Sequence, residues 1–412
     1  MEIYAVGGAV RDALLDLPVT ERDWVVVGAT PTELMGLGYT QVGREFPVFL
    51  HPETHEEYAM ARTERKVAAG HTGFSFDTSK AVTLEQDLAR RDLTINAMAQ
   101  DSAGQLIDPY GGQADLANRK LRHVSAAFRE DPLRVLRVAR FAARFQELGF
   151  AVATETLELM AAMSSSGELD SLTPERVWQE THKALQTPRP DIYFEVLRNC
   201  GALSSVFPEV ANLYGVPQPA RWHPEIDTGL HTLMALKQSA ALTSNPAVRF
   251  AVLTHDLGKA TTPKAMLPRH HGHGERSVTL IEELAKRLRV PNRYVQLAVR
   301  VARYHGLAHR AFELRAKTIF DLITALDGIR QPERYEEFLL ACEADARGRK
   351  GLEERRYVQA ELLRNALASA RQVTTAALSS DLEGPALGAA LRRQRITAIE
   401  RLLQASASVE QD

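Results

Sequence analysis

Short apolar runs separated by turns make up the first part of the chain. The runs at 3–6, 23–27, 48–50 and 58–62 are rich in β-branched and aromatic residues, which predicts strands. Segments of helical composition, such as 11–17, alternate with them. Residues 65–80 lack periodicity and contain Gly70 and Gly73, so we expect a flexible loop there.

From about Asp115 onwards the apolar positions follow helical spacing, and we expect no strand beyond this point. Thr173 and Pro174 suit the cap and the first position of a helix over 175–185. The proline- and glycine-containing segment 215–219 predicts a linker. The predicted fold class is α+β, with a small mixed head at 1–113, an all-α neck and body at 114–222, an all-α domain at 223–350 and a helical tail at 351–412.

Composition narrows the class of protein. The 412 residues are 45% hydrophobic and 25% charged, which is typical of a soluble globular protein with more than one domain. No apolar stretch is long enough to span a membrane, and the chain begins directly with an expected strand, so we expect neither a span nor a signal peptide. Cys200 and Cys342 lie far apart and are expected to be reduced thiols of a cytoplasmic protein.

Charge is distributed unevenly. The net charge of −2 argues against a polycation that coats nucleic acid. Between Arg119 and Arg144, however, there are eight Lys/Arg and only two Asp/Glu. We therefore expect contact with nucleic acid to be concentrated in this segment.

Gly7 and Gly8 stand at the turn between the first expected strand and the helix that follows it. A phosphate can meet bare backbone N–H groups at such a turn, and Arg11 can add a bidentate contact. Further along, Glu21 and Asp23 lead into the second strand, where residues two apart point to the same side. A glycine pair is usually only a turn, and an acidic pair is usually a solvated edge. In this order and this close together, they favour a Mg²⁺-dependent nucleotidyl-transfer site.

An arginine-rich helix is expected to begin near Pro132. Its arginines fall within one arc of about 120° at helical spacing, and few acidic residues stand at i±4 to pair them. A solvated cationic face is the alternative, but the upstream carboxylates favour a phosphate clamp. These arginines are Arg134, Arg137, Arg140 and Arg144, and the charged group Arg90-Arg91-Asp92 precedes them in the chain.

Asp131 lies beside Arg134 on the same expected helix start. A carboxylate only accepts hydrogen bonds and a guanidinium only donates them. Cytosine and adenine each present an amino donor beside a ring-nitrogen acceptor, whereas uracil and guanine present the reverse arrangement. We therefore hypothesise that this pair acts as a protein template that selects CTP and ATP.

Histidines are concentrated in one part of the chain. Eight of the thirteen fall between residues 223 and 309, and His255-Asp256 ends an apolar helical segment. A lone histidine on such a face is usually a core residue, but imidazole and carboxylate groups together hold divalent metals. The eight are His223, His231, His255, His270, His271, His273, His305 and His309.

These motifs, taken in order, resemble those of the bacterial CCA-adding tRNA nucleotidyltransferases and their poly(A) polymerase relatives. The resemblance covers residues 1 to about 350 and includes a C-terminal HD phosphohydrolase domain at 223–350. It rests on Gly7-Gly8-Ala9-Val10-Arg11-Asp12, Glu21-x-Asp23, Arg90-Arg91-Asp92, Asp108-Pro109-Tyr110-Gly111-Gly112, Glu130-Asp131-x-x-Arg134 and the histidine region.

The resemblance implies a polymerase-beta-like head that adds C and A to the tRNA 3′ end from CTP and ATP. It implies Mg²⁺ binding by Glu21 and Asp23, with Glu21 standing where the family usually has Asp, and with Glu56 or Glu57 as a third carboxylate. The loop at 65–80 resembles a segment whose mobility switches the site from C to A. The implied nucleotide-binding residues are Gly8, Arg11, Arg91, Arg137 and Arg140, and the implied templating residues are Asp131 and Arg134.

In the HD domain, the resemblance implies His231, His255, Asp256 and Asp345 as metal ligands, with His305 and the 270–273 group as weaker candidates. It implies phosphatase, 2′-nucleotidase and 2′,3′-cyclic phosphodiesterase activities, with Ni²⁺ as one suitable metal. His255 and Asp256 would be catalytic there, as Glu21 and Asp23 would be in the head. No membrane partner is expected, and a monomer or a homodimer would both be consistent with the sequence.

Two alternatives remain at this stage. One is a poly(A) polymerase on the same scaffold, which would be expected to carry a basic RNA-binding extension, whereas this tail ends with Glu410 and Asp412. The other is an HD phosphohydrolase whose head binds RNA without polymerising, for which only Glu21 gives support.

Overall fold

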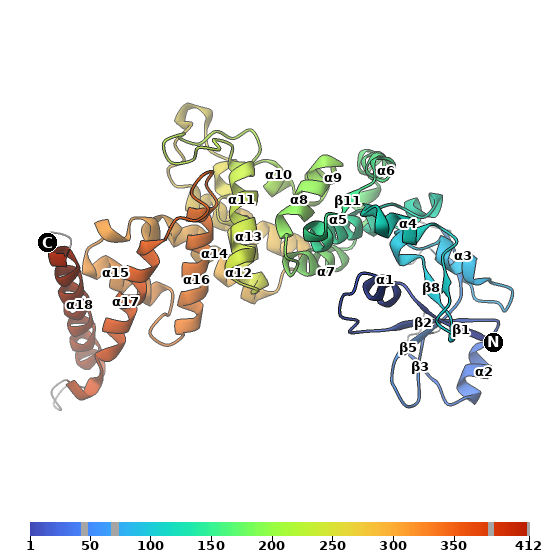
Figure 1. The fold of residues 1–412 in the computed structure, drawn as a ribbon. Helices are drawn as coiled ribbons and strands as arrows, with labels where there is room; N and C mark the ends of the chain where they lie inside the picture. The colour runs from blue at the N-terminus through green and yellow to red at the C-terminus, as the bar shows by residue number, and fades with distance from the viewer. Residues whose placement is uncertain (43–47, 67–73, 378–382, 410–412) are drawn as a thin grey trace. The chain divides into compact units, whose positions relative to one another are not determined.

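The computed structural model describes residues 1–42, 48–66, 74–377 and 383–409 (Figure 1). The chain divides into two compact units. Unit 1 comprises Met1–Ala184 and Ile192–Val206, and unit 2 comprises Leu185–Asp191 and Phe207–Asp412. In the described part of the chain, no helix has both the length and the apolar character that a membrane crossing needs.

A mixed sheet forms the core of unit 1. Its strand order is β3-β4-β5-β2-β1-β8-β9, in which β2 pairs antiparallel with β1 and parallel with β5. The strands are β1 (Glu2–Val6), β2 (Asp23–Val27), β3 (Thr40–Val42), β4 (Val48–Leu50), β5 (Glu57–Met60), β8 (Ala99–Gln100) and β9 (Leu106–Ile107). The strands predicted at 3–6, 23–27, 48–50 and 58–62 are therefore present, with shifts of one or two residues at some ends.

Strand β2 is the middle strand of the sheet, and its Val25 and Val26 are buried on opposite faces. Val25 packs with Val6 and Leu88 on one face, and Val26 packs with Phe49 and Leu34 on the other. The strand begins at Asp23, so the carboxylates lie where the strand emerges from the core.

Two expectations about strands are wrong. Part of the loop predicted at 65–80 is a hairpin, β6 (Thr63–Lys66) with β7 (Phe74–Asp77), and the segment 67–73 lies outside the described residues. The alternating Phe-Ser-Phe-Asp sequence of β7 is typical of a strand, but the two nearby glycines favoured the prediction of a loop. Strands also occur beyond residue 115, since β10 (Lys120–Leu121) pairs in parallel with β11 (Ala151–Val152). Two-residue strands leave no periodic signal.

Helices make up the rest of unit 1. Helix α1 begins at Gly8, earlier than the predicted 11–17, and α7 begins at Pro174 as predicted. The helices are α1 (Gly8–Leu14), α2 (Pro31–Gly36), α3 (Leu84–Ala89), α4 (Gly112–Ala117), α5 (Leu133–Phe145), α6 (Thr154–Ser165), α7 (Pro174–Leu185), α8 (Pro190–Asn199) and α9 (Ala202–Val206). The predicted α+β class, a mixed head followed by helices, is confirmed.

Unit 2 is helical in its described part. Helix α12 packs against α14, and α11 packs against α16, which encloses the histidine region. The helices are α10 (Pro208–Ala211), α11 (Thr228–Leu242), α12 (Pro246–Thr254), α13 (His273–Leu288), α14 (Asn292–His309), α15 (Ala316–Ala325), α16 (Pro332–Arg347), α17 (Val358–Gln372) and α18 (Gly384–Val409).

The segment 215–219 is not a linker between compact parts. It lies inside unit 2, where Pro217 forms an isolated bridge with Asp227 and the Gln218 side chain is buried against Lys259. Proline and glycine favour a turn here, and the turn brings Gln218 to Lys259 in the histidine region.

Candidate functional site

The residues predicted to bind nucleotide and Mg²⁺ line one cavity of about 570 Å³ in unit 1. The chain brings them together from the β1–α1 turn, the start of β2, the end of α3 and helix α5. They are Gly8, Arg11, Glu21, Asp23, Arg91, Asp131, Arg134, Arg137 and Arg140. The geometry therefore collects the predicted set, and their roles remain a proposal.

Close packing of Arg91 against the β1–α1 turn requires glycine at position 7. Gly7 has φ +70°, and a Cβ at this position would lie 2.8 Å from Arg91 Nη1. Arg11 is buried; it donates to Asp12 and Asn96, and it lies over the rings of Phe141 and Phe145. The turn thus places a fixed guanidinium beside bare backbone at the cavity wall.

Two carboxylates line this cavity. Glu21 and Asp23 are both exposed and both line it. Asp23 is in register with Glu57 on the parallel strand β5, and the two residues line a smaller cavity together with Arg62, Arg90 and Arg91. Glu56 instead accepts a hydrogen bond from Trp24 Nε1 at 3.0 Å. Of the two candidates for a third carboxylate, Glu57 is the one placed beside Asp23.

The arginines of α5 find acidic partners from distant parts of the chain. Arg137 donates to Asp92 Oδ2 at 2.8 Å, and Arg140 donates to Glu180 Oε2. Burial alone would raise the pKa of Asp92, but Arg137 and Asn96 hold it well below its usual range. The scarcity of acidic residues at i±4 did not predict whether these arginines are paired. Their partners come instead from α7 and from the segment after α3.

Asp131 and Arg134 line the same cavity but have separate partners. Asp131 Oδ2 lies 2.7 Å from Arg176 Nη2, on the first turn of α7. Arg134 donates through Nη1 to the Ala127 carbonyl at 2.6 Å and through Nη2 to the Arg90 carbonyl at 2.5 Å. Sequence reasoning did not identify Arg176, because no local pattern links it to Asp131.

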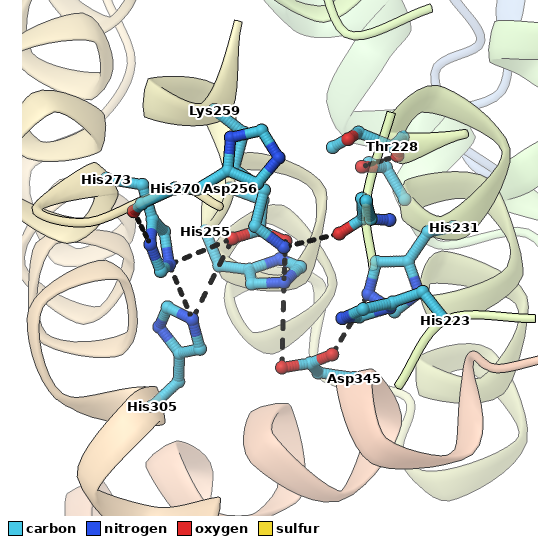
Figure 2. Close-up of polar contacts among 12 residues, drawn as sticks. His223, Thr228, His231, His255, Asp256, Lys259, His270, His273, His305 and Asp345 are labelled. Carbon is cyan, nitrogen blue, oxygen red and sulfur yellow. Dashed lines mark hydrogen bonds and ion pairs between the residues drawn. The ribbon is translucent and has the colours of Figure 1, made fainter. Parts of the chain in front are cut away.

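Four predicted ligands of the second site meet in unit 2 (Figure 2). His231 comes from α11, His255 and Asp256 follow the end of α12, and Asp345 comes from α16. All four are buried. His231 Nε2 lies 3.0 Å from Asp345 Oδ1, and His255 Nε2 lies 3.1 Å from Asp256 Oδ2 and 3.7 Å from Asp345 Oδ2.

A second group of donors adjoins the first through Asp256. Its Oδ1 lies 3.3 Å from His273 Nε2 and 3.8 Å from His305 Nε2, and these two rings approach to 3.2 Å. Lys259, which sequence reasoning did not assign a role, lies 2.6 Å from Asp256 Oδ2. His309, likewise unassigned, lies 2.6 Å from Asp345 Oδ2. The contacts of Asp256 with His273 and His305 and of Asp345 with His309 join separate helices, so spacing along the chain gave no signal for them.

The donor set fits a divalent cation. Among the described residues, His255 Nε2 and Asp256 Oδ1 are buried without a hydrogen-bond partner, although opposite charges stand close to them. Burial alone would lower the pKa of His255, but Asp256 and Asp345 raise it to about 9. Imidazole and carboxylate groups in such a cluster are the ligands that Mn²⁺, Ni²⁺ and Zn²⁺ accept. These residues could hold one or two such ions.

A larger cavity of about 870 Å³ opens beside this cluster. Seven lysine and arginine residues and one glutamate are among its lining residues, so it suits an anion. Trp222 lines it with 56% of its surface exposed, and the Arg221 guanidinium lies 4.8 Å from the indole. The exposed indole gives this basic cavity a flat aromatic face on which a ligand with a planar ring can stack.

Three family models match the chain. They are described as "Poly A polymerase head domain" at residues 3–122, "Probable RNA and SrmB- binding site of polymerase A" at 149–214, and "HD domain" at 228–346. The first covers the mixed sheet and the glycine turn and carboxylates of its cavity, whereas helix α5 lies between the first and second matches. The third covers the four predicted metal ligands of the histidine cluster.

The chain is 60% identical over 403 residues to a multifunctional CCA protein of Thioalkalivibrio sulfidiphilus, covering 98% of each chain. Among solved structures, it is similar to a CCA-adding enzyme with ATP at a TM-score of 0.65 and 18% identity, covering 99% of this chain and 90% of that one. It is also similar to the Thermotoga maritima CCA-adding enzyme complexed with tRNA at a TM-score of 0.62 and 19% identity, covering 98% and 91%. The structural likenesses show the fold, and the close relative confirms the family resemblance.

Proposed function

This chain belongs to the multifunctional CCA protein family, and from that premise we propose that it adds C, C and A to the 3′ end of tRNA from CTP and ATP. The observation that carries the proposal is one cavity of unit 1 that is lined both by carboxylates at the start of β2 and by arginines of helix α5. Negative groups suited to a metal and positive groups suited to a triphosphate thus line the same cavity.

Each group of residues has a distinct task in the proposed reaction. Glu21, Asp23 and Glu57 would hold Mg²⁺, which when bound neutralises the phosphate charge and lowers the pKa of the attacking hydroxyl. Gly8, Arg11, Arg91, Arg137 and Arg140 would bind the triphosphate. Asp131 and Arg134 would read the edge of the incoming base, where acceptor and donor match cytosine and adenine.

The chemical step is an in-line displacement. The terminal hydroxyl of the tRNA attacks the α-phosphorus, and the bond from that phosphorus to the bridging oxygen breaks as pyrophosphate leaves. The proton of the hydroxyl passes to solvent. Arg11 and Arg91 beside the glycine turn would stabilise the charge that develops on the leaving group.

Glu21 keeps an oxygen donor at the position where the family usually has Asp. Its extra methylene lengthens the reach to the cation, so we expect activity with an altered preference among Mg²⁺ and larger divalent ions. Tandem CCACCA addition to unstable tRNA would use the same residues and no further site.

We propose a second activity in the HD domain, hydrolysis of phosphate esters, with His231, His255, Asp256 and Asp345 as metal ligands. The metal, for which Ni²⁺ is suited by its imidazole ligands, would supply an activated water when bound. The large basic cavity beside the ligands supports phosphorylated substrates, and Trp222 supports a substrate with a base. These features are consistent with 2′-nucleotidase and 2′,3′-cyclic phosphodiesterase activities as well as with a general phosphatase.

The first test uses purified protein, Mg²⁺, labelled CTP and ATP, and a tRNA transcript that lacks its last three nucleotides, with an A-tailed RNA as competitor. We expect growth by C, C and A followed by a stop. Long A-tails on either RNA would favour a poly(A) polymerase, and no incorporation would favour an HD hydrolase with a binding head.

Paired variants separate the two activities. Asp23→Asn should abolish nucleotide addition and spare hydrolysis of a cyclic nucleotide, whereas His255→Ala should do the reverse. Loss of both activities in either variant would contradict the assignment of two independent sites.

A further inference from the structure

Glu225 carries a buried carboxylate next to the HD ligands, and the proposed reaction does not use it. It lies in the turn before α11, and its side chain is only 3% exposed. Its Oε1 lies 3.0 Å from His223 Nδ1 and 3.0 Å from His231 Nδ1. One carboxylate oxygen therefore lies within hydrogen-bond distance of the Nδ1 atoms of two neighbouring histidines.

The surroundings of His231 determine which of its nitrogens carries hydrogen. Nδ1 faces Glu225 Oε1 and the Gly348 carbonyl oxygen, each at 3.0 Å. Both groups can only accept, so Nδ1 must be the donor. The other nitrogen, Nε2, faces Asp345 Oδ1 at 3.0 Å, on the side of the predicted metal ligands (Figure 2).

We propose that Glu225 is a positioning residue of the HD metal site, which fixes the tautomer and the ring orientation of His231 so that Nε2 is the ligand atom. A carboxylate behind a ligating imidazole also makes the ring a stronger base toward the metal. The inference rests on the HD metal site of the proposed function, and it adds a residue outside the four ligands.

The position of Glu225 is itself fixed. Its Oε2 accepts from the Lys350 backbone N–H at 3.3 Å, and its Oε1 accepts from His223. The Gly348 carbonyl is equally constrained, because a Cβ at Gly348 would lie 2.4 Å from Ala235 Cα. Two rigid acceptors thus hold the His231 ring from behind, as preorganised metal sites require.

A different role for the same residues is a separate metal bound by His223, Glu225 and His231, whose ligand atoms also lie close together. The two roles predict different results. A positioning residue changes the affinity of the HD site for metal and leaves the number of bound ions unchanged. A ligand of a separate ion changes that number.

The experiment measures metal binding by the full-length chain. Glu225→Ala and Glu225→Gln are made in an Asp23→Asn background, which removes the head site, and Co²⁺ is titrated into metal-free protein in competition with a chromophoric chelator. Glu283→Gln, an exposed carboxylate on α13, is the matched control. We expect an unchanged stoichiometry, a dissociation constant raised about 10- to 100-fold in Glu225→Ala, and an intermediate value in Glu225→Gln, whose amide oxygen still accepts. The visible spectrum of bound Co²⁺ should shift in both.

Wild-type affinity in Glu225→Ala would overturn the inference, and so would the loss of one bound ion. Nucleotide addition by Glu225→Ala with Asp23 intact should match the wild type, which shows that the chain is folded. If His255→Ala binds Co²⁺ as tightly as the parent, the HD metal site of the proposed function fails instead, and this result is distinct from a failure of Glu225.

Discussion

Asp131 is joined to Arg176 by an ion pair of 2.7 Å, which connects the segment just before α5 to the first turn of α7. Both residues line the head cavity. The predicted base-reading carboxylate is therefore held by a cation from another helix, and its other oxygen accepts from the Leu133 N–H at 3.1 Å. The pair is half-buried, so we expect it to contribute modestly to stability while it fixes the direction of the Asp131 carboxylate.

We expect Arg176→Ala to lower kcat/KM for CTP and ATP about tenfold, because one partly buried charged hydrogen bond is worth about 1–2 kcal/mol. The freed Asp131 should also tolerate wrong bases. Single-nucleotide incorporation with each of the four triphosphates measures both effects. Arg129→Ala is the control, since Arg129 faces Glu168 and does not line the cavity.

Arg134→Ala tests the template hypothesis directly. Loss of the guanidinium should reduce discrimination against UTP, while the triphosphate contacts of other arginines remain. Unchanged discrimination in Arg134→Ala would contradict the hypothesis, and unchanged kcat/KM in Arg176→Ala would contradict the positioning of Asp131.

The sequence allowed the strands, α7 and the grouping of charged residues to be predicted, because apolar periodicity and caps are local signals. It did not allow the ion pairs Asp92–Arg137 and Glu180–Arg140 to be predicted, because each pair joins residues that lie far apart in the chain. The same reason explains why His231, His255 and Asp345 were found by resemblance, whereas His309 and Glu225 needed the fold. The hairpin at 63–77 was obscured because glycines dominated the local pattern.

Glu57→Gln should reduce the rate of nucleotide addition at least about a hundredfold, as expected for a lost metal ligand worth several kcal/mol. The reason is its register with Asp23 on the adjacent strand. Glu56→Gln is the matched control, because that side chain accepts from Trp24 instead. Single-turnover addition of CMP at saturating CTP distinguishes them, and equal losses in the two variants would count against Glu57.

Asp92→Asn should destabilise unit 1 by about 2 kcal/mol near pH 7, because Arg137 loses its buried partner. The pKa of Asp92 is lowered by Arg137, so its stabilisation is complete above the unfolded value of about 3.9 and is lost as the pH falls below it. The difference between wild type and variant should therefore be constant from pH 7 to about pH 5 and shrink at lower pH. Urea unfolding followed by circular dichroism measures it, with the exposed Asp170→Asn as control. A difference that grows as the pH falls would contradict the assigned pair.

Trp222 should determine whether the HD cavity prefers nucleotides. One face of its indole is covered by Arg221, and stacking of a base on an aromatic side chain is worth about 1–3 kcal/mol. Trp222→Ala should therefore raise KM for 2′,3′-cyclic AMP about tenfold with little change in kcat, and leave hydrolysis of glycerol phosphate unchanged. Phe312→Ala is the matched control, because Phe312 is also 56% exposed and does not line the cavity. Equal losses for both substrates in Trp222→Ala would mean that the indole supports the cavity wall and contacts no base.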